Sequence, residues 1–326
     1  MPLASVWKNY ISNGTEQGGT KVMEEQKKKR LIGFALILTA SLLNGVIPSF
    51  TQRVLALGLS LETILTSRYL MGAALIWIYI FAKGKNFRVE KSNIAYMLAL
   101  GFMLFVCTSS LGESYKYLPG AVAVIIGFSY VVIVVLIEIL VGREKVETKR
   151  VFCLLLAVAG LGIVIWPMGD MPQLRALGIL FALLGAFFYA MQTLGIGSKR
   201  MKEIQAEVIT GYMNLFIFGA NLARCLLAGK PIFPDTMEQW GWIFVIGAGS
   251  AFIAPLFFCM AVKKLGGSDT ALTNTTEPVF AYFAGILIMG DQLSWNATLG
   301  GILVVSSVFL LNLPKKKKKG VHLFQW

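Results

Sequence analysis

The residues with the most chemistry to offer lie inside apolar runs of the chain. Glu277 is the clearest of them, because it stands within such a run directly before Pro278. A charge at the centre of a membrane helix costs about 2.5–3.5 kcal/mol, and acids that persist there usually face a cavity and handle ions or protons. We therefore expect Glu277 to bind a cationic group or to carry a coupling proton. The alternative is a neutral structural acid that bonds a neighbouring helix.

Two apolar runs share the pattern of an asparagine four residues before a proline. Asn44 precedes Pro48 in one run, and Asn274, followed by Thr275, precedes Pro278 in the other. A helical proline leaves the carbonyl four residues back without its N–H partner. Such backbone persists at membrane depth only where protein or a water-filled cavity satisfies it. We expect two broken helices that line a binding site; packing kinks without a ligand are the alternative.

Arg68 also lies in an apolar run. A buried guanidinium needs an anionic or carbonyl partner. Arg68 could attract a carboxylate of a solute, bond a neighbouring helix, or extend its side chain toward the membrane surface. Polar residues near the middle of other runs complete the candidate cavity, although each could instead bond between helices: Ser109, Ser110, Ser129, Tyr130, Tyr189, Gln192 and Asn214.

Ten apolar runs hold these residues, and each is long enough to cross a bilayer. A hydrocarbon core of about 30 Å needs about 20 apolar residues in a helix. The runs are 31–51, 62–82, 94–112, 120–141, 151–167, 176–197, 206–228, 241–262, 270–290 and 297–313. Because backbone groups in lipid must bond within the protein, the sequence predicts an all-α integral membrane protein with ten transmembrane helices.

The basic residues fall almost entirely into every second gap between the runs, with 22 on one side and 4 on the other. Lys and Arg in short loops mark the cytoplasmic side. We therefore expect a multi-pass membrane protein with both termini in the cytoplasm; the bacterial inner membrane is the location implied by the family resemblance given below. This distribution also explains the net charge of +13, so we expect no nucleic-acid partner.

The ten runs divide into two fives, 31–168 and 176–313. The third to fifth runs align with the eighth to tenth runs at a fixed offset in the sequence. Leu118 and Gly120 correspond to Leu265 and Gly267, and an acidic residue follows the next run in each unit, at Glu144 and Asp291. Since five is odd, the second unit enters the membrane from the opposite face, which predicts an inverted repeat. Residues 1–30 form a cytoplasmic tail in which Met23 is a candidate start, with an ordinary disordered tail as the alternative, and 314–326 form a basic tail.

Several of these features resemble the drug/metabolite transporter superfamily, in its bacterial EamA-type branch. The resemblance rests on the ten-run layout, on Arg68 in the segment 66–69 (TSRY), and on the segments 114–120 (SYKYLPG) and 276–280 (TEPVF). Val131 departs from the pattern, because family members often have proline there. The resemblance implies transport of small metabolites and does not identify the solute.

The sequence thus predicts a secondary transporter that moves a small metabolite, amino acid or drug-like solute by alternating access, driven by a proton or another gradient. Its expected partners are the solute and membrane lipid, and the sequence leaves open whether two copies of the chain form a homodimer. An integral membrane enzyme and a channel or sensor are the alternatives. Against an enzyme, His322 is the only histidine and no metal-ligand cluster or nucleophile motif occurs, so we expect no catalytic residue, metal or cofactor.

Overall fold

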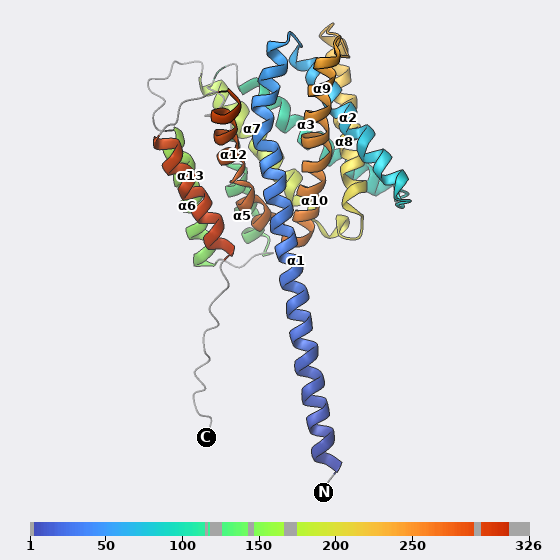
Figure 1. Ribbon diagram of the computed structural model, residues 1–326, viewed down its shortest axis with the longest axis vertical. Helices are drawn as coiled ribbons and strands as arrows, with labels where there is room; N and C mark the ends of the chain where they lie inside the picture. Colours follow the sequence, from blue (N-terminus) through green and yellow to red (C-terminus); the bar gives the residue numbers. More distant parts are fainter. Residues whose placement is uncertain are drawn as a thin grey trace.

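The structure is a computed structural model that describes residues 3–114, 117, 126–142, 147–165, 175–289 and 295–312, although not the side chains of residues 3–23 or of scattered later residues, Pro48 among them. Every regular element among these residues is helical, as the sequence predicts, and the long helices form one bundle (Figure 1). The predicted repeat markers at 118–120, Glu144 and Asp291 and the basic tail 314–326 fall outside the described residues.

The helices form two groups in chain order. The first group comprises α1 (Leu3–Ala56), α2 (Leu61–Ala82), α3 (Lys91–Ser114), α5 (Tyr130–Leu140) and α6 (Thr148–Ile165). The second comprises α7 (Arg175–Ile196), the short helix η1 (Lys199–Met201), α8 (Ala206–Leu227), α9 (Met237–Ile246), the π-helix η2 (Gly247–Ile253), α10 (Ala254–Leu265), α11 (Gly267–Asn274), α12 (Glu277–Ala284), the π-helix η3 (Gly285–Met289) and α13 (Trp295–Asn312). Both groups are built almost wholly of helix.

Several segments are long and apolar enough to cross a membrane. Within the described residues they are Glu24–Ala56, Leu61–Ala82, Lys91–Ser114, Ala176–Ile196 and Met237–Leu265, and two shorter apolar helices cover Tyr130–Leu140 and Val151–Gly160. The helix α8 is as long as α2, but it carries the buried polar residues Glu207, Asn214 and Asn221. The chain is therefore a helical membrane protein, and these segments coincide with predicted runs.

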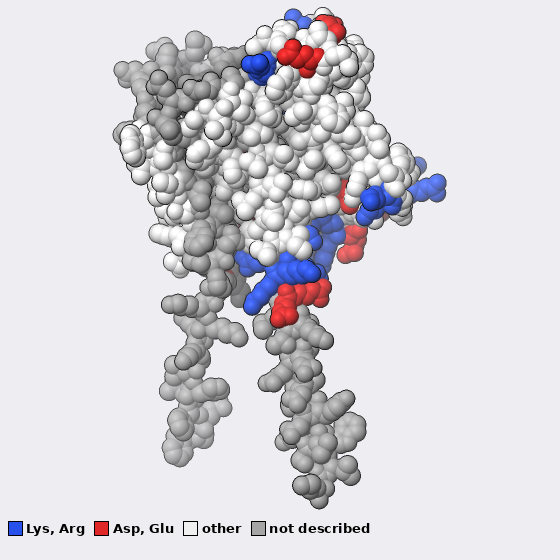
Figure 2. Space-filling model, viewed as in Figure 1, with Lys and Arg blue, Asp and Glu red and all other residues white. Residues whose placement is uncertain are grey.

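The two ends of the bundle carry different charges. At the end from which α1 projects, Lys85 pairs with Glu207 at 3.5 Å, and Arg200 Nε donates to Asn93 Oδ1 at 2.8 Å. At the other end, Arg224 lies 3.5 Å from a carboxylate oxygen of Glu113. Figure 2 shows Lys and Arg gathered toward the first end, with the described atoms of the middle almost free of charge. This banding is what a membrane-embedded bundle requires.

The helices of the two groups interlock in a reciprocal pattern. The first helix of the first group, α1, packs against α10 and α12, and the first helix of the second group, α7, packs against α3 and α5. In the same way α2 packs against η2, and α8 packs against α3. Three further contacts join helices that occupy equivalent positions in the two groups: α2 with α8, α5 with α11 and α6 with α13. The two groups therefore make equivalent contacts with each other.

The first helix corrects one expectation. The helix α1 runs without interruption from Leu3 to Ala56, so the break expected between Asn44 and Pro48 is absent. The same helix continues through residues 3–30, which the sequence suggested as a cytoplasmic tail, and it projects well beyond the bundle (Figure 1). Proline is tolerated in membrane helices because neighbouring groups can satisfy the freed carbonyl.

Candidate functional site

The second predicted break is present and positions the central acid of the site. The helix α11 ends at Asn274, α12 begins at Glu277, and two threonines lie between them. The hydroxyl of Thr275 donates to the Leu272 carbonyl at 2.6 Å, and the Thr276 hydroxyl donates to the Thr273 carbonyl at 2.9 Å. Threonine hydroxyls compete in this way with the helical N–H groups for backbone carbonyls. Asn274 and Glu277 thus stand on either side of a stabilised gap.

A close approach of α1 brings Asn44 to this gap. A Cβ atom built at Gly45 would lie 2.9 Å from the Glu277 carbonyl oxygen and 2.7 Å from the Phe280 Cβ. Only a residue without a side chain allows the two backbones to come so near. The neighbouring Asn44 side chain consequently lies within hydrogen-bonding reach of the Glu277 carboxyl group.

Asn274 is the hub of the hydrogen bonds around the gap, and it is fully buried. Its Oδ1 accepts from the Ser41 hydroxyl of α1 at 2.9 Å. Its Nδ2 donates to the Tyr130 hydroxyl of α5 at 3.0 Å and to Glu277 Oε2 at 3.2 Å. One amide therefore links α1, α5 and α12 through directional bonds.

Aromatic rings form one side of the site. The ring centroids of Tyr130 and Tyr189 lie 4.5 Å apart, and the Tyr189 ring stacks on Phe258 at 5.7 Å. Both tyrosines are close enough to Glu277 and Cys107 to interact with them electrostatically, and Tyr189 also interacts with Tyr69. Rings packed in this way present apolar faces and hydroxyl groups to the same space.

Arg68 stands near the acid without forming an ion pair with it. Its guanidinium carbon lies 5.2 Å from the centre of the Tyr69 ring, and its charge interacts with the Glu277 carboxyl. No ion pair within 4.0 Å joins the two among the described side chains. The sequence alone did not indicate that these two residues lie close together. Within the part of the chain that the structure describes, the buried Nε of Arg68 has no hydrogen-bond partner, so its N–H is available as a donor.

Other predicted residues add polar atoms that no described group of the chain satisfies. Gln192 Oε1 and the Ser129 hydroxyl are buried without a hydrogen-bond partner, as is the Ser109 hydroxyl. Buried polar groups in proteins are nearly always bonded, so each such exception needs an explanation. Gln192 follows Tyr189 by three residues on α7 and therefore shares its face of the helix. A polar ligand beside the tyrosines would satisfy these atoms.

Asn214 has a different position. Its Nδ2 donates to the Ala251 carbonyl at 2.5 Å. Pro255 stands four residues after Ala251 and cannot supply the usual N–H to that carbonyl. The side chain of Asn214 thus replaces the missing backbone bond in η2. We leave Asn214 out of the proposed binding site, because its donor is already used in holding this helix together.

Sequence reasoning missed four residues that matter here. Ser41 was not proposed as a site residue, although it lies three residues before Asn44 and therefore on the same face of α1. Tyr69 stood only as the last residue of the segment 66–69 (TSRY) and was not proposed for the site, and Cys107 has no signal in the sequence that separates it from an ordinary apolar position. Glu138 had the same signal as Glu277, an acid within an apolar run, and it is buried at 6% exposure.

Among the residues that the structure describes, no group of three or more His, Cys, Asp or Glu residues could hold a metal ion.

Comparisons with known proteins match nearly the whole chain. The profile of the EamA-like transporter family matches residues 31–166 and 176–313. An uncharacterized transporter of Archaeoglobus fulgidus is 23% identical over 66% of this chain and 75% of its own length. A solute carrier family 35 member B1 homolog of Drosophila melanogaster is 22% identical over 77% of this chain and 79% of its own.

An uncharacterized transporter of Bacillus subtilis is 23% identical over 73% of this chain and 76% of its own length. A crystal structure with a TM-score of 0.71 covers 87% of this chain and 97% of the solved chain at 19% sequence identity. At that identity the similarity demonstrates the fold. The family profile thus matches the chain twice.

Proposed function

Because the chain belongs to the EamA-like transporter family, we propose that it is a secondary transporter that moves a small-molecule solute across the bacterial inner membrane by alternating access. The observation that supports this most is the polar site at the break between α11 and α12. There a carboxyl group, an asparagine hub and a guanidinium Nε that no described group bonds lie together inside the bundle. Intramembrane ionisable groups of this kind characterise solute and ion pathways.

The proposed architecture is ten transmembrane helices in two inverted five-helix repeats. The reciprocal packing supports it, since the contacts of α1 with α10 and α12 have counterparts in those of α7 with α3 and α5. Two halves that make equivalent contacts can exchange roles, which is the basis of alternating access in inverted-repeat transporters. The charge distribution supports cytoplasmic termini, with the end that carries Arg200 facing the cytoplasm.

The site chemistry suits a small solute with at least one charged group. Glu277 would bind a cationic group, and Arg68 would bind an anionic one. The rings of Tyr130 and Tyr189 would contact apolar parts of the solute, and Gln192 would supply a hydrogen bond. A metabolite, an amino acid or a drug-like cation would each meet some of these groups.

Coupling would follow from competition at Glu277. A carboxyl group can bind a proton or a cationic group of the solute, and binding of one excludes the other. If each conformation of the protein exposes Glu277 to one side only, this exclusion exchanges solute for protons. Asn274 and Asn44 would hold the carboxyl in place during the exchange, because both contact it in the structure.

Transport by the purified protein in sealed vesicles tests this function. We expect uptake that depends on a proton gradient and counterflow of labelled solute, and we expect Glu277→Gln to reduce gradient-driven uptake to background. Glutamine keeps the size and hydrogen-bonding capacity of the side chain but cannot ionise. Glu277→Asp should keep partial activity with an altered pH dependence. The matched control is Glu238→Gln, because Glu238 is an exposed acid at the far end of the bundle.

The outcomes separate the alternatives. Downhill flux without counterflow would indicate a channel, and no flux of any tested solute would favour a sensor or an enzyme. Gradient-driven transport at the normal rate by Glu277→Gln would remove Glu277 from the mechanism and leave Arg68 as the next candidate. Loss of activity in both Glu277→Gln and Glu238→Gln would point to a general loss of folding instead.

A further inference from the structure

The short helix α11 has a joint at each end. Gly266, which separates α10 from α11, has a φ of +88°, a left-handed conformation that residues with side chains rarely adopt. At the other end, Thr275 and Thr276 interrupt the helix before Glu277. Between the joints, all eight residues from Gly267 to Asn274 are buried. The segment is thus a rigid helical rod between two places where the backbone can turn.

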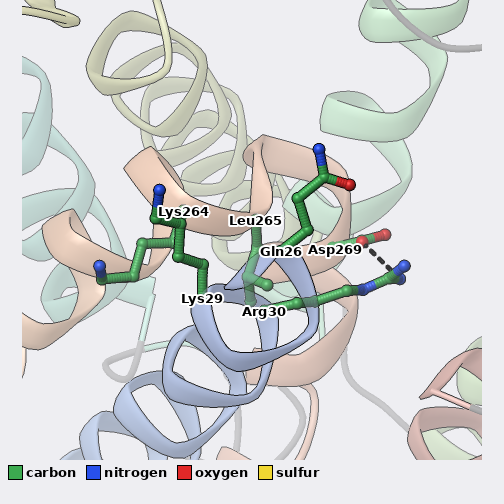
Figure 3. Close-up of a pocket in the computed structure, with 6 residues that line it drawn as sticks. All are labelled: Gln26, Lys29, Arg30, Lys264, Leu265 and Asp269. Atoms are coloured by element: carbon green, nitrogen blue, oxygen red, sulfur yellow. Dashed lines mark hydrogen bonds and ion pairs between the residues drawn. The ribbon is translucent and has the colours of Figure 1, made fainter. Parts of the chain in front are cut away.

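Two neighbouring helices hold the start of α11 by side-chain bonds. Glu138 of α5 accepts a hydrogen bond from the Ser268 N–H at 3.0 Å and another from the Ser268 hydroxyl. Arg30 of α1 pairs with Asp269 at 3.1 Å, as the dashed line in Figure 3 shows. The carboxylate of Asp269 is only 6% exposed, whereas the Arg30 side chain is 52% exposed. Charged bonds from both sides therefore fix this end.

The same two helices hold the other end of α11. The Ser41 hydroxyl of α1 and the Tyr130 hydroxyl of α5 both bond the side chain of Asn274. The helices α1 and α5 belong to the first half of the chain, and α11 belongs to the second. The segment is consequently held between the halves at four points, two of which are next to Glu277.

The bonds that hold α11 can be exchanged more readily than packed apolar surface. Only Ala271 and Leu272 of its eight residues are apolar, in the sequence GSDTALTN. Elements that move are drawn from the least stable parts of a fold. A cavity of about 300 Å³ also lies beside its first turn, lined by Gln26, Lys29, Arg30, Lys264, Leu265 and Asp269 (Figure 3). This cavity leaves room for the first turn to shift.

We propose that α11 is the gate that closes the solute site toward the Arg30 face of the protein, and that Glu138 and Arg30 are positioning residues that hold it shut. The proposal rests on the proposed transport function, because a gate needs a transported solute. Movement of α11 about Gly266 and Thr275 would break the bonds to Ser268 and Asp269. It would also pull on Asn274, and so occupancy of the Glu277 site would be communicated to the gate through a single rigid segment.

A cysteine on α11 measures its opening from each side of the membrane. The four native cysteines are replaced by serine, and Ala271→Cys is introduced, because Ala271 is fully buried while α11 is in place. A membrane-impermeant maleimide is then added to vesicles of either orientation. Glu138→Gln and Arg30→Gln should raise the labelling rate from the Arg30 face about tenfold, the effect expected for loss of a charged hydrogen bond. Labelling from the opposite face should not rise.

Two further variants keep the test decisive. Ser268→Ala removes only the hydroxyl and should give a smaller increase on the same face, and it replaces Glu138→Gln if that variant fails to fold. Glu203→Gln, an exposed acid at the same end of the bundle, should have no effect. Equal increases on both faces would indicate loosened packing and overturn the proposal, as would unchanged labelling in Arg30→Gln and Ser268→Ala.

Solute flux in the same variants separates this proposal from the transport function. If labelling changes on one face but no solute is transported, the proposal that α11 moves is supported and the proposed transport function is contradicted. If solute flux depends on Glu277 but labelling does not change in the variants, the transport function is supported and the gate proposal is contradicted.

Discussion

The same spacing of asparagine and proline has opposite results in two helices. Between Asn44 and Pro48 the helix α1 is continuous, whereas between Asn274 and Pro278 the chain divides into α11 and α12. Both prolines lack the N–H that would bond the asparagine carbonyl. The spacing alone therefore does not break a membrane helix, and the residues inside the motif must decide.

Those inner residues differ in chemistry. The first motif contains Gly-Val-Ile and the second contains Thr-Thr-Glu. Gly45, Val46 and Ile47 offer no side-chain group that could replace a backbone bond, so α1 keeps its helical path. In the second motif, Thr275 and Thr276 bond the carbonyls of the preceding turn and stabilise its end. The comparison teaches that a break needs both a missing donor and local groups that take its place.

The two asparagines should differ most when they are removed. Asn274→Ala takes partners from Ser41, Tyr130 and Glu277 and should lower the free energy of unfolding by about 2 kcal/mol. It should also abolish gradient-driven transport. Asn44→Ala removes one contact to Glu277 and should cost about 0.6 kcal/mol. Thermal unfolding in detergent and vesicle uptake measure both effects, and equal losses for the two variants would contradict the asymmetry.

The contact that joins the two motifs should be the next most sensitive. Gly45→Ala places a methyl group within 2.9 Å of backbone atoms of α12, which cannot yield as a flexible side chain would. We expect a loss of about 1–3 kcal/mol in stability and reduced transport, because α1 must move away from Glu277. The control is Gly219→Ala, since a Cβ at Gly219 meets no atom within 4 Å. Similar stability of Gly45→Ala and Gly219→Ala would mean that α1 and α12 can separate without cost.

The sequence predicted the helical fold and the central acid, because charge and hydropathy act locally along the chain. It also predicted that Asn274, Tyr130 and Tyr189 belong together, from their polarity within apolar runs. It did not predict that Arg68 lies within electrostatic range of Glu277, since depth along a helix ignores where helices tilt and cross. Asn214 looked like a solute ligand for a related reason: its partner, the Ala251 carbonyl, lies on another helix. Partners distant in sequence are set by packing, which one sequence does not display.

The prolines should show the smallest difference, and its direction tests the comparison most directly. Pro48→Ala changes a helix that is already continuous, so we expect normal transport and an unchanged or slightly higher unfolding temperature. Pro278→Ala supplies an N–H that can bond the Asn274 carbonyl, which favours a continuous helix across Thr275 and Thr276. We expect transport to fall several-fold, with stability kept or raised. If both variants transport normally, the threonines maintain the break by themselves. If Pro48→Ala is the more damaging change, the functional bend lies in α1 and the assignment of the break to α11 and α12 is wrong.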